Sequence, residues 1–198
     1  MRYNLTCITD SIEEPVTKSD LLTHVRVTEE DDEKILLLYA KAARRHLEKT
    51  CGISMMLSTW SLYLDYFPSF IEIPRLPLNS LSSIKYRDTS STWSTYVGVA
   101  LGDNSKVQII DSDNYCEIRP AYGTSWPSPT PIPECVWITY VAGYGSSQND
   151  VPADLRLAVL MLASHYFENR EASSQLDLRP LPFGVESLIS PYNCQRGM

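Results

Sequence analysis

The sequence predicts an α+β protein in which a helical framework carries an inserted β-rich subdomain. Two observations lead to this fold class. Apolar residues recur at helical spacing in an early segment and in a late segment, which predicts two long helices. Between them, apolar and polar residues alternate, as they do in half-buried strands. Short helices are expected near both ends of the chain. Three parts of the chain are expected. Residues 1–56 contain an N-terminal arm and the first helices, and residues 57–145 form the β-rich insertion. Residues 146–198 contain the late helix, a short C-terminal helix and a tail.

The late helix is expected over Pro152–Glu171. Pro152 suits the first turn of a helix, and Asp154 places negative charge where the helix dipole favours it. A surface helix needs one apolar stripe, but this segment has two adjoining ones. The first contains Leu155, Ala158, Val159, Leu162 and Tyr166, and the second contains Leu157, Leu160 and Met161. The helix is therefore predicted to be central to the fold.

The early helix is expected over Glu29–Thr50, capped by Thr28 and ended by Gly52. The acid run Glu29–Glu33 complements the positive end of the helix dipole. One apolar face contains Ile35, Leu38, Tyr39, Ala42 and His46, and another contains Leu36, Ala40, Ala43, Leu47 and Cys51. Lys41, Arg44, Arg45 and Lys49 are interpreted as solvated charges. The two long helices carry more apolar surface than one helix pair covers, so the middle of the chain or neighbouring subunits must cover the rest.

Two further helix signals are shorter. Thr17-Lys-Ser-Asp20 fits a capping box that opens a short helix. Val185, Leu188 and Ile189 recur at helical spacing before Pro191, which predicts a short helix near the C-terminus.

The segment between the long helices contains seven predicted strands and one long loop. The strands cover Trp60–Tyr66, Phe70–Ile73, Leu81–Tyr86, Ser94–Val99, Val107–Ile110, Tyr115–Arg119 and Val136–Val141. The loop Pro120–Pro133 is rich in proline, glycine and serine.

Composition excludes several classes of protein. With 198 residues, 43% hydrophobic and 21% charged, the chain is typical of a globular protein. Its net charge of −7 argues against a protein that binds nucleic acid tightly through the phosphates. The same charge is compatible with a channel wall along which DNA moves without binding. No apolar run reaches the length of a membrane span or a signal peptide, so no membrane contact is expected. The five cysteines are scattered and odd in number, which indicates reduced thiols in a cytoplasmic product.

The sequence offers no catalytic, cofactor-binding or metal-binding residues. His24, His46 and His165 are isolated, and no nucleophile motif, zinc motif or phosphate loop occurs. Two alternatives stay open on the residues alone. One is a soluble enzyme or small-molecule binding protein with a pocket in the β-subdomain. The other is a DNA-binding clamp, which requires an inward stripe of Lys41, Arg44, Arg45 and Lys49.

Several segments together resemble one family, the head–tail connector (adaptor) proteins of long-tailed bacteriophages and of related prophages and gene-transfer particles. The segments are Asp20–Thr28, Glu29–Glu33, Leu47–Gly52, Tyr140–Gly145, Val151-Pro152, His165–Glu171 and Leu181–Tyr192. The resemblance spans nearly the whole chain and depends on the order and spacing of the segments. In this chain, the β-rich segment is larger than in purely helical members of the family.

The resemblance implies a structural virion protein in the head–tail neck, assembled in the host cytoplasm. Its partners would be other copies of itself in a ring, usually twelve-fold, together with the portal protein and a stopper, head-completion or tail-completion protein. Packaged DNA would pass through the channel without sequence-specific binding. The family has no catalytic residues to carry over.

Two segments are predicted to contact other proteins. Tyr122 and Trp126, in the proline-rich loop, supply contact area without cationic residues. A short C-terminal helix is marginal alone in water and needs a surface to lie on. Either it folds back on its own subunit, or it docks on the portal or a neighbouring subunit, with Phe183, Val185, Leu188, Ile189 and Tyr192 as anchors.

Overall fold

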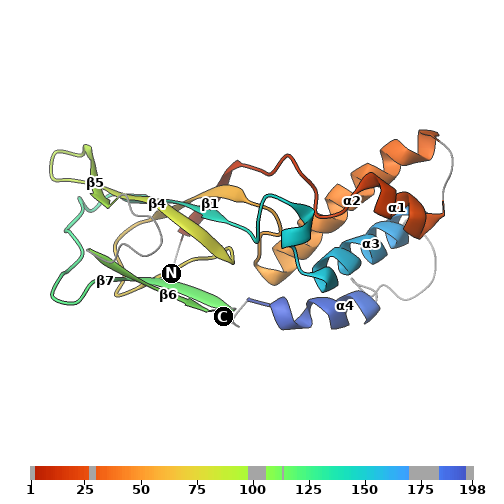
Figure 1. Ribbon diagram of the computed structural model, residues 1–198. Coiled ribbons are helices and arrows are strands. Elements are labelled where there is room, and N and C mark those ends of the chain that lie inside the picture. Colours follow the sequence, from red (N-terminus) through yellow and green to blue (C-terminus); the bar gives the residue numbers. More distant parts are fainter. Residues whose placement is uncertain (1–2, 27–29, 98–105, 113, 170–182, 195–198) are drawn as a thin grey trace. The chain divides into compact units, whose positions relative to one another are not determined.

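The computed structural model describes residues 3–26, 30–97, 106–112, 114–169 and 183–194 (Figure 1). Within these ranges the chain forms eight strands and four α-helices. The strands are β1 (Tyr3–Thr9), β2 (Ser58–Leu64), β3 (Ile71–Glu72), β4 (Leu78–Arg87), β5 (Trp93–Val97), β6 (Val107–Ser112), β7 (Tyr115–Pro120) and β8 (Val136–Ala142). The helices are α1 (Lys18–Val25), α2 (Glu30–Cys51), α3 (Ala153–Glu168) and α4 (Phe183–Ile189), with short 3₁₀ turns at Gln148–Asp150 and Ser190–Tyr192.

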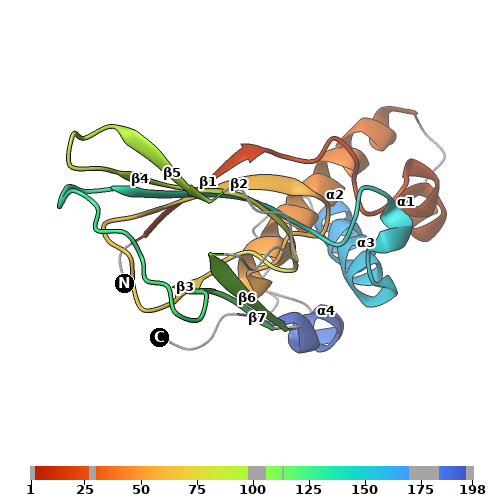
Figure 2. The ribbon, with the colours of Figure 1, turned by 60° about the vertical axis from the view of Figure 1, so that its left-hand side comes forward.

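The chain divides into two compact units, one built from strands and one from helices. The strand unit comprises Met1–Ser11 and Leu57–Tyr144, and the helical unit comprises Ile12–Met56 and Gly145–Met198. The strand unit contains two antiparallel sheets, visible in Figure 2. One has five strands in the order β1-β2-β8-β4-β5, and the other has three in the order β3-β7-β6.

The alternation of side chains explains why β8 lies at the centre of the larger sheet. Val136, Ile138, Tyr140 and Ala142 are buried, and the residues between them are half-buried. Successive side chains of a strand point to opposite faces, so one face of β8 belongs to the core. Burial also raises the pKa of the Tyr140 hydroxyl far above its usual range.

The predicted fold class is wrong in its architecture, although the mixture of α and β structure is right. The described residues form eight strands in two antiparallel sheets beside four α-helices, not a framework of two long helices with an insertion. The segment predicted as an N-terminal arm contains strand β1, which pairs with β2. β1 is almost wholly exposed and its partner lies some fifty residues away, so local periodicity could not reveal it. Helix α3 has 16 residues and ends at Glu168, before the predicted limit.

The sequence patterns located the individual elements more successfully than the architecture. Each of the seven strands predicted between the long helices has a counterpart, β2 to β8. The predicted capping box is also confirmed. The Asp20 amide donates to Thr17 Oγ1 at 3.0 Å, and the Thr17 amide donates to Asp20 Oδ2 at 3.1 Å. Hydrogen bonds from Thr17 lower the pKa of the Asp20 carboxyl.

The helical unit has α3 at its centre. α3 packs against α2 and α4, and α1 contacts both α2 and α3 (Figure 1). The predicted packing of the two long helices against each other is thus confirmed. The buried side chains come from one face of each helix: Leu36, Ala40, Ala43, Leu47 and Cys51 of α2, and Leu155, Ala158, Val159, Leu162 and Ala163 of α3. Among the described residues, no helix combines the length and apolarity needed to cross a lipid bilayer.

Replacing Leu162 by aspartate tests this core. Leu162 is completely buried, so the carboxylate would lose its hydration without gaining a partner. We expect Leu162→Asp to lower the free energy of unfolding by roughly 3 to 5 kcal/mol. Leu157→Asp, a matched change at a position 42% exposed on the same helix, should have little effect on the dilute subunit. Urea unfolding of both variants measures the difference, and equal stabilities would contradict the assignment of the core.

Candidate functional site

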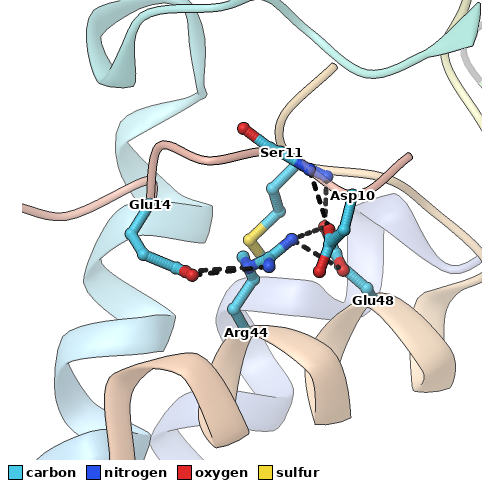
Figure 3. Close-up of polar contacts among 6 residues, drawn as sticks. Asp10, Ser11, Glu14, Arg44 and Glu48 are labelled. Carbon is cyan, nitrogen blue, oxygen red and sulfur yellow. Dashed lines mark hydrogen bonds and ion pairs between the residues drawn. The ribbon is translucent and has the colours of Figure 1, made fainter. Parts of the chain in front are cut away.

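A buried ion-pair cluster around Arg44 fixes the helical unit (Figure 3). The Arg44 side chain on α2 is completely buried. Its Nε lies 2.8 Å from Oε2 of Glu14, and its Nη1 donates to both carboxylate oxygens of Glu48 at 3.4 Å. Glu48 Oε1 also accepts the backbone N–H of Met55 at 2.7 Å. The Arg44 guanidinium therefore ties α2 to the segment before α1, and the Glu48 carboxylate beside it ties α2 to the segment that follows its end.

This cluster corrects the sequence interpretation of Arg44 as a solvated charge. Lys41, Arg45 and Lys49 are exposed, whereas Arg44 lies on the buried side of α2. The stripe required for a DNA-binding clamp, with Arg44 as a member, does not form. Glu48, four residues after Arg44, was a local signal for an ion pair. Glu14, thirty residues earlier, had no such signal, so burial of the pair could not be predicted.

The opposite side of α2 remains exposed. It includes Ile35, Leu37 and Leu38, of which Leu38 is 65% exposed. We call the side chains Lys34, Ile35, Leu38, Lys41, Ala42, Arg45 and Lys49 the cationic face of α2; all of them are exposed. Apolar and cationic side chains at these spacings lie on one side of a helix. The sequence predicted that the long helices carry more apolar surface than one helix pair covers. Part of that apolar surface on α2 is exposed in the single subunit.

The loop 121–133 is held in place from within the strand unit. Trp126 stacks on Phe67 with ring centroids 4.9 Å apart and contacts the Tyr96 ring at 5.7 Å. The Tyr96 hydroxyl donates to the Ser125 carbonyl at 3.2 Å, and the Thr130 amide donates to the Arg87 carbonyl at 2.9 Å. Of the two residues predicted as contacts, Trp126 is thus half-buried in an aromatic cluster that fixes the loop.

Tyr122 has the opposite environment. Its side chain is fully exposed, and the next residue, Gly123, has a φ of +76°, a left-handed conformation that glycine adopts at little cost. Thr124 closes the turn, since its amide and its hydroxyl both donate to the Ala121 carbonyl, at 2.9 and 2.7 Å. The loop therefore presents an exposed tyrosine on an ordered backbone. That Tyr122 contacts another protein stays a prediction.

The C-terminal helix lies against α3 in the same subunit. Val185 and Ile189 are buried, while Leu188 and Tyr192 are half-buried. The Tyr192 hydroxyl donates to Asp154 Oδ2 at 3.0 Å, and Gly184 lies so close to Met161 that a Cβ there would be 2.9 Å from the Met161 methyl carbon. Several predicted positions lie outside the described part of the chain. They are residues Glu29, Arg170 and Glu171, and the side chains of Phe183 and of Glu30–Asp32 in the acid run. Whether this segment also docks on a second protein stays a prediction.

Aromatic and cationic side chains alternate across one face of the five-stranded sheet. Trp137 stacks on Tyr63 at 5.8 Å, and the Lys85 ammonium lies 4.9 Å from the Trp137 ring centroid. The Arg87 guanidinium lies 4.3 Å from the centroid of Trp93. Each of these pairs joins two different strands, so it depends on the strand register. They stabilise the sheet and leave half-exposed rings on its surface.

The strand unit also has an open hollow at one end of β1 and β2. Its volume is about 500 Å³, and Tyr3, Asn4, Tyr63, Asp65, Pro133 and Glu134 line it. Asn4 Nδ2 donates to Glu134 Oε1 at 3.0 Å, and the Glu134 amide donates to Asp65 Oδ1 at 2.9 Å. These carboxylates thus accept hydrogen bonds from the protein itself.

Two of the buried thiols are poorly placed for nucleophilic chemistry. Burial raises the pKa of Cys51 to about 11 and that of Cys116 to about 12, so neither is a thiolate near neutral pH. Among the described residues, no three histidine, cysteine or carboxylate side chains gather closely enough to hold a metal ion. Three exposed surfaces are candidate contacts for another molecule: the loop with Tyr122, the α3–α4 region and the cationic face of α2.

Comparison with solved structures gives the same fold over nearly the full chain. A chain in the neck of an empty gene transfer agent particle, treated with C6 symmetry, is similar with a TM-score of 0.79 and 22% identity, covering 98% of this chain and 97% of that one. A chain of the native gene transfer agent virion has a TM-score of 0.75 and 22% identity, with coverage of 98% and 97%. A chain in the native neck, treated with C12 symmetry, has a TM-score of 0.75 and 21% identity, covering 100% and 98%.

This chain therefore has the fold of chains found in the neck and in the virion of gene transfer agent particles. The sequence of residues 121–193 matches the family described as "Phage gp6-like head-tail connector protein". The predicted resemblance to head–tail connector proteins is thereby confirmed for that part of the chain, which includes the Tyr122 loop, β8, α3 and α4. None of the curated proteins compared has a matching sequence.

The Arg44 cluster gives a second test of the helical unit. Arg44→Met would leave the Glu14 and Glu48 carboxylates without their cation, and we expect it to lower the free energy of unfolding by about 3 kcal/mol. Arg45→Met, the neighbouring exposed position, should change it by less than about 0.5 kcal/mol. Denaturant unfolding of the two variants checks the contrast. Equal small effects would mean that the Arg44 ion pairs contribute little.

Proposed function

We propose that this chain is a structural head–tail connector that forms a ring in the neck of a phage-like particle. The match of residues 121–193 to the connector family carries the proposal. The whole-chain likeness to neck chains of gene transfer agents supports it, and two of those structures have C6 or C12 symmetry, which a ring of identical subunits satisfies. The ring extends the channel for packaged DNA and provides an attachment surface on its tail side.

Its partners in this proposal are the portal protein on the head side and a stopper or tail-completion protein on the tail side. The two predicted contact segments would present their side chains to a partner in different ways. Tyr122 projects from an ordered loop, so little conformational entropy is lost when a partner covers it. Leu188 and Tyr192 present part of their surface from a helix whose Val185 and Ile189 already belong to the subunit core. Docking by the C-terminal segment then uses the outward side of a preformed helix.

Particles assembled without this chain test the proposed function. We expect DNA-filled heads that lack tails, because the surface for tail attachment is missing. Electron microscopy and a count of tailed particles measure the result, and supplying the unaltered chain should restore tails. Normal tailed particles formed without the chain would refute the connector function.

A narrower prediction concerns Tyr122. Tyr122→Ser should leave the stability of the subunit unchanged, because the side chain is fully exposed. It should lower the yield of tailed particles by about tenfold if the ring anchors a partner through this tyrosine. Tyr66→Ser, another change at an exposed tyrosine of the strand unit, is the control. Equal yields from the two variants would remove Tyr122 from the interface.

A further inference from the structure

The exposed surface of α3 is the charge complement of the cationic face of α2. Ala153, Asp154, Leu157, His165 and Glu168 are exposed on α3, and their spacing places them on one side of the helix. We call these residues the acidic face of α3. Asp154 also accepts the hydrogen bond from the Tyr192 hydroxyl. Leu157 at 42% exposure gives this face an apolar centre. No lysine or arginine of α3 is exposed, since Arg156 is half-buried and lies 3.7 Å from Asp20.

The cationic face of α2 also combines apolar and charged side chains, but its charges are positive. Between Lys34 and Lys49, the exposed residues of α2 include four lysine or arginine side chains and no carboxylate. Lys34, Leu38, Lys41, Arg45 and Lys49 recur every three or four residues, so they form a line about 22 Å long. Leu38, 65% exposed, lies within this line. Each face thus combines an exposed leucine with charges of a single sign.

We propose that the cationic face of α2 in one copy of this chain binds the acidic face of α3 in the next copy, and that this contact joins the subunits of the ring. The proposal rests on the proposed function, because it names the surfaces through which that ring assembles. One subunit cannot bring its own two faces together. The opposite side of α2, with Leu36, Ala43 and Leu47, is the side buried in the subunit core.

The two faces differ from each other, which determines the kind of assembly. A contact between unlike surfaces is heterologous, so every subunit offers one of each and the chain of contacts continues until it closes into a ring. A contact of α2 with α2 would instead set lysines and arginines against each other. Like charges facing across an interface oppose association, whereas opposite charges favour it and fix the register.

A polyanion such as duplex DNA is the other occupant that a cationic helix face suggests. The apolar residues among the cations favour a protein surface instead. Ile35, Leu38 and Ala42 are exposed on this face, and contact with backbone phosphates would leave them in water. Burying them against Leu157 of a neighbouring copy removes apolar surface from water on both sides. The net charge of −7 also weakens attraction of the whole subunit to DNA.

Two charge-reversed variants test the proposal in complementary ways. Lys41→Glu/Arg45→Glu makes the α2 face acidic, and Leu157→Lys/Glu168→Lys makes the α3 face cationic. All four positions are exposed, so both variants should keep the melting temperature of the unaltered chain. Each variant then has two faces of like charge, and we expect its self-association constant to fall by at least about tenfold. Native mass spectrometry and sedimentation over a range of concentrations measure it.

Mixing the two variants is the decisive step. The reversed α2 face of one then meets the reversed α3 face of the other, while the unaltered faces also match. Assemblies that contain both variants in equal amounts should therefore reappear, and raising the salt concentration should weaken them. As a control, Glu72→Lys, a charge change at an exposed position of the strand unit, should leave assembly unchanged.

Several results would overturn the proposal. Rings that form equally well from either variant alone, or variants that fail to assemble when mixed, exclude these faces but leave the connector function standing. Retention of duplex DNA at low salt that is lost in Lys41→Glu/Arg45→Glu, with ring formation intact, assigns the α2 face to DNA instead. An unaltered chain that stays monomeric at every concentration and occurs as single copies in the particle refutes the ring, and this inference with it.

Discussion

Arg44 is the constraint on which the helical unit depends. A guanidinium with no exposed surface must be matched by carboxylates, because an unpaired buried charge costs several kcal/mol. Glu14 and Glu48 supply them, and Glu48 also holds the Met55 amide. Two stretches of chain, the one before α1 and the one after α2, are thus fixed relative to α2. Since this fixes which side of α2 faces α3, it also fixes which side, with Leu38 and Lys41, remains for another molecule.

The two segments proposed as contacts are held in place within the single subunit. Trp126 stacks on Phe67 and so holds the loop that exposes Tyr122. Val185 and Ile189 attach α4 to α3, and a hydrogen bond from Tyr192 to Asp154 continues that attachment. A seven-residue helix has little stability by itself, so its packing on α3 provides it. If these segments bind partners as proposed, few residues become ordered upon binding, which lowers the entropic cost of each contact.

Net charge hides how charge is distributed over the surface. The chain carries −7 overall, yet the exposed residues of α2 between Lys34 and Lys49 carry only positive charge and those of α3 include Asp154 and Glu168. In the proposed connector, an acidic channel wall would avoid tight attachment to the phosphates of passing DNA. Local cations next to exposed leucines are suited to a different task, the recognition of an acidic protein surface.

By itself, the sequence determined most of the helices and strands and a resemblance to one class of protein. Helical spacing located α2 and α3, alternation located β2 to β8, and the side chains of Thr17 and Asp20 defined the start of α1, because these signals are carried by neighbours within a few residues. The order of short segments indicated the connector family. Only the tertiary structure decided what depends on distant partners: the pairing of β1 with β2, the burial of Arg44 against Glu14, the Trp126 cluster and the side of α4 that meets α3. Burial and strand register are properties of the whole chain, so local patterns could not predict which of these surfaces would remain exposed.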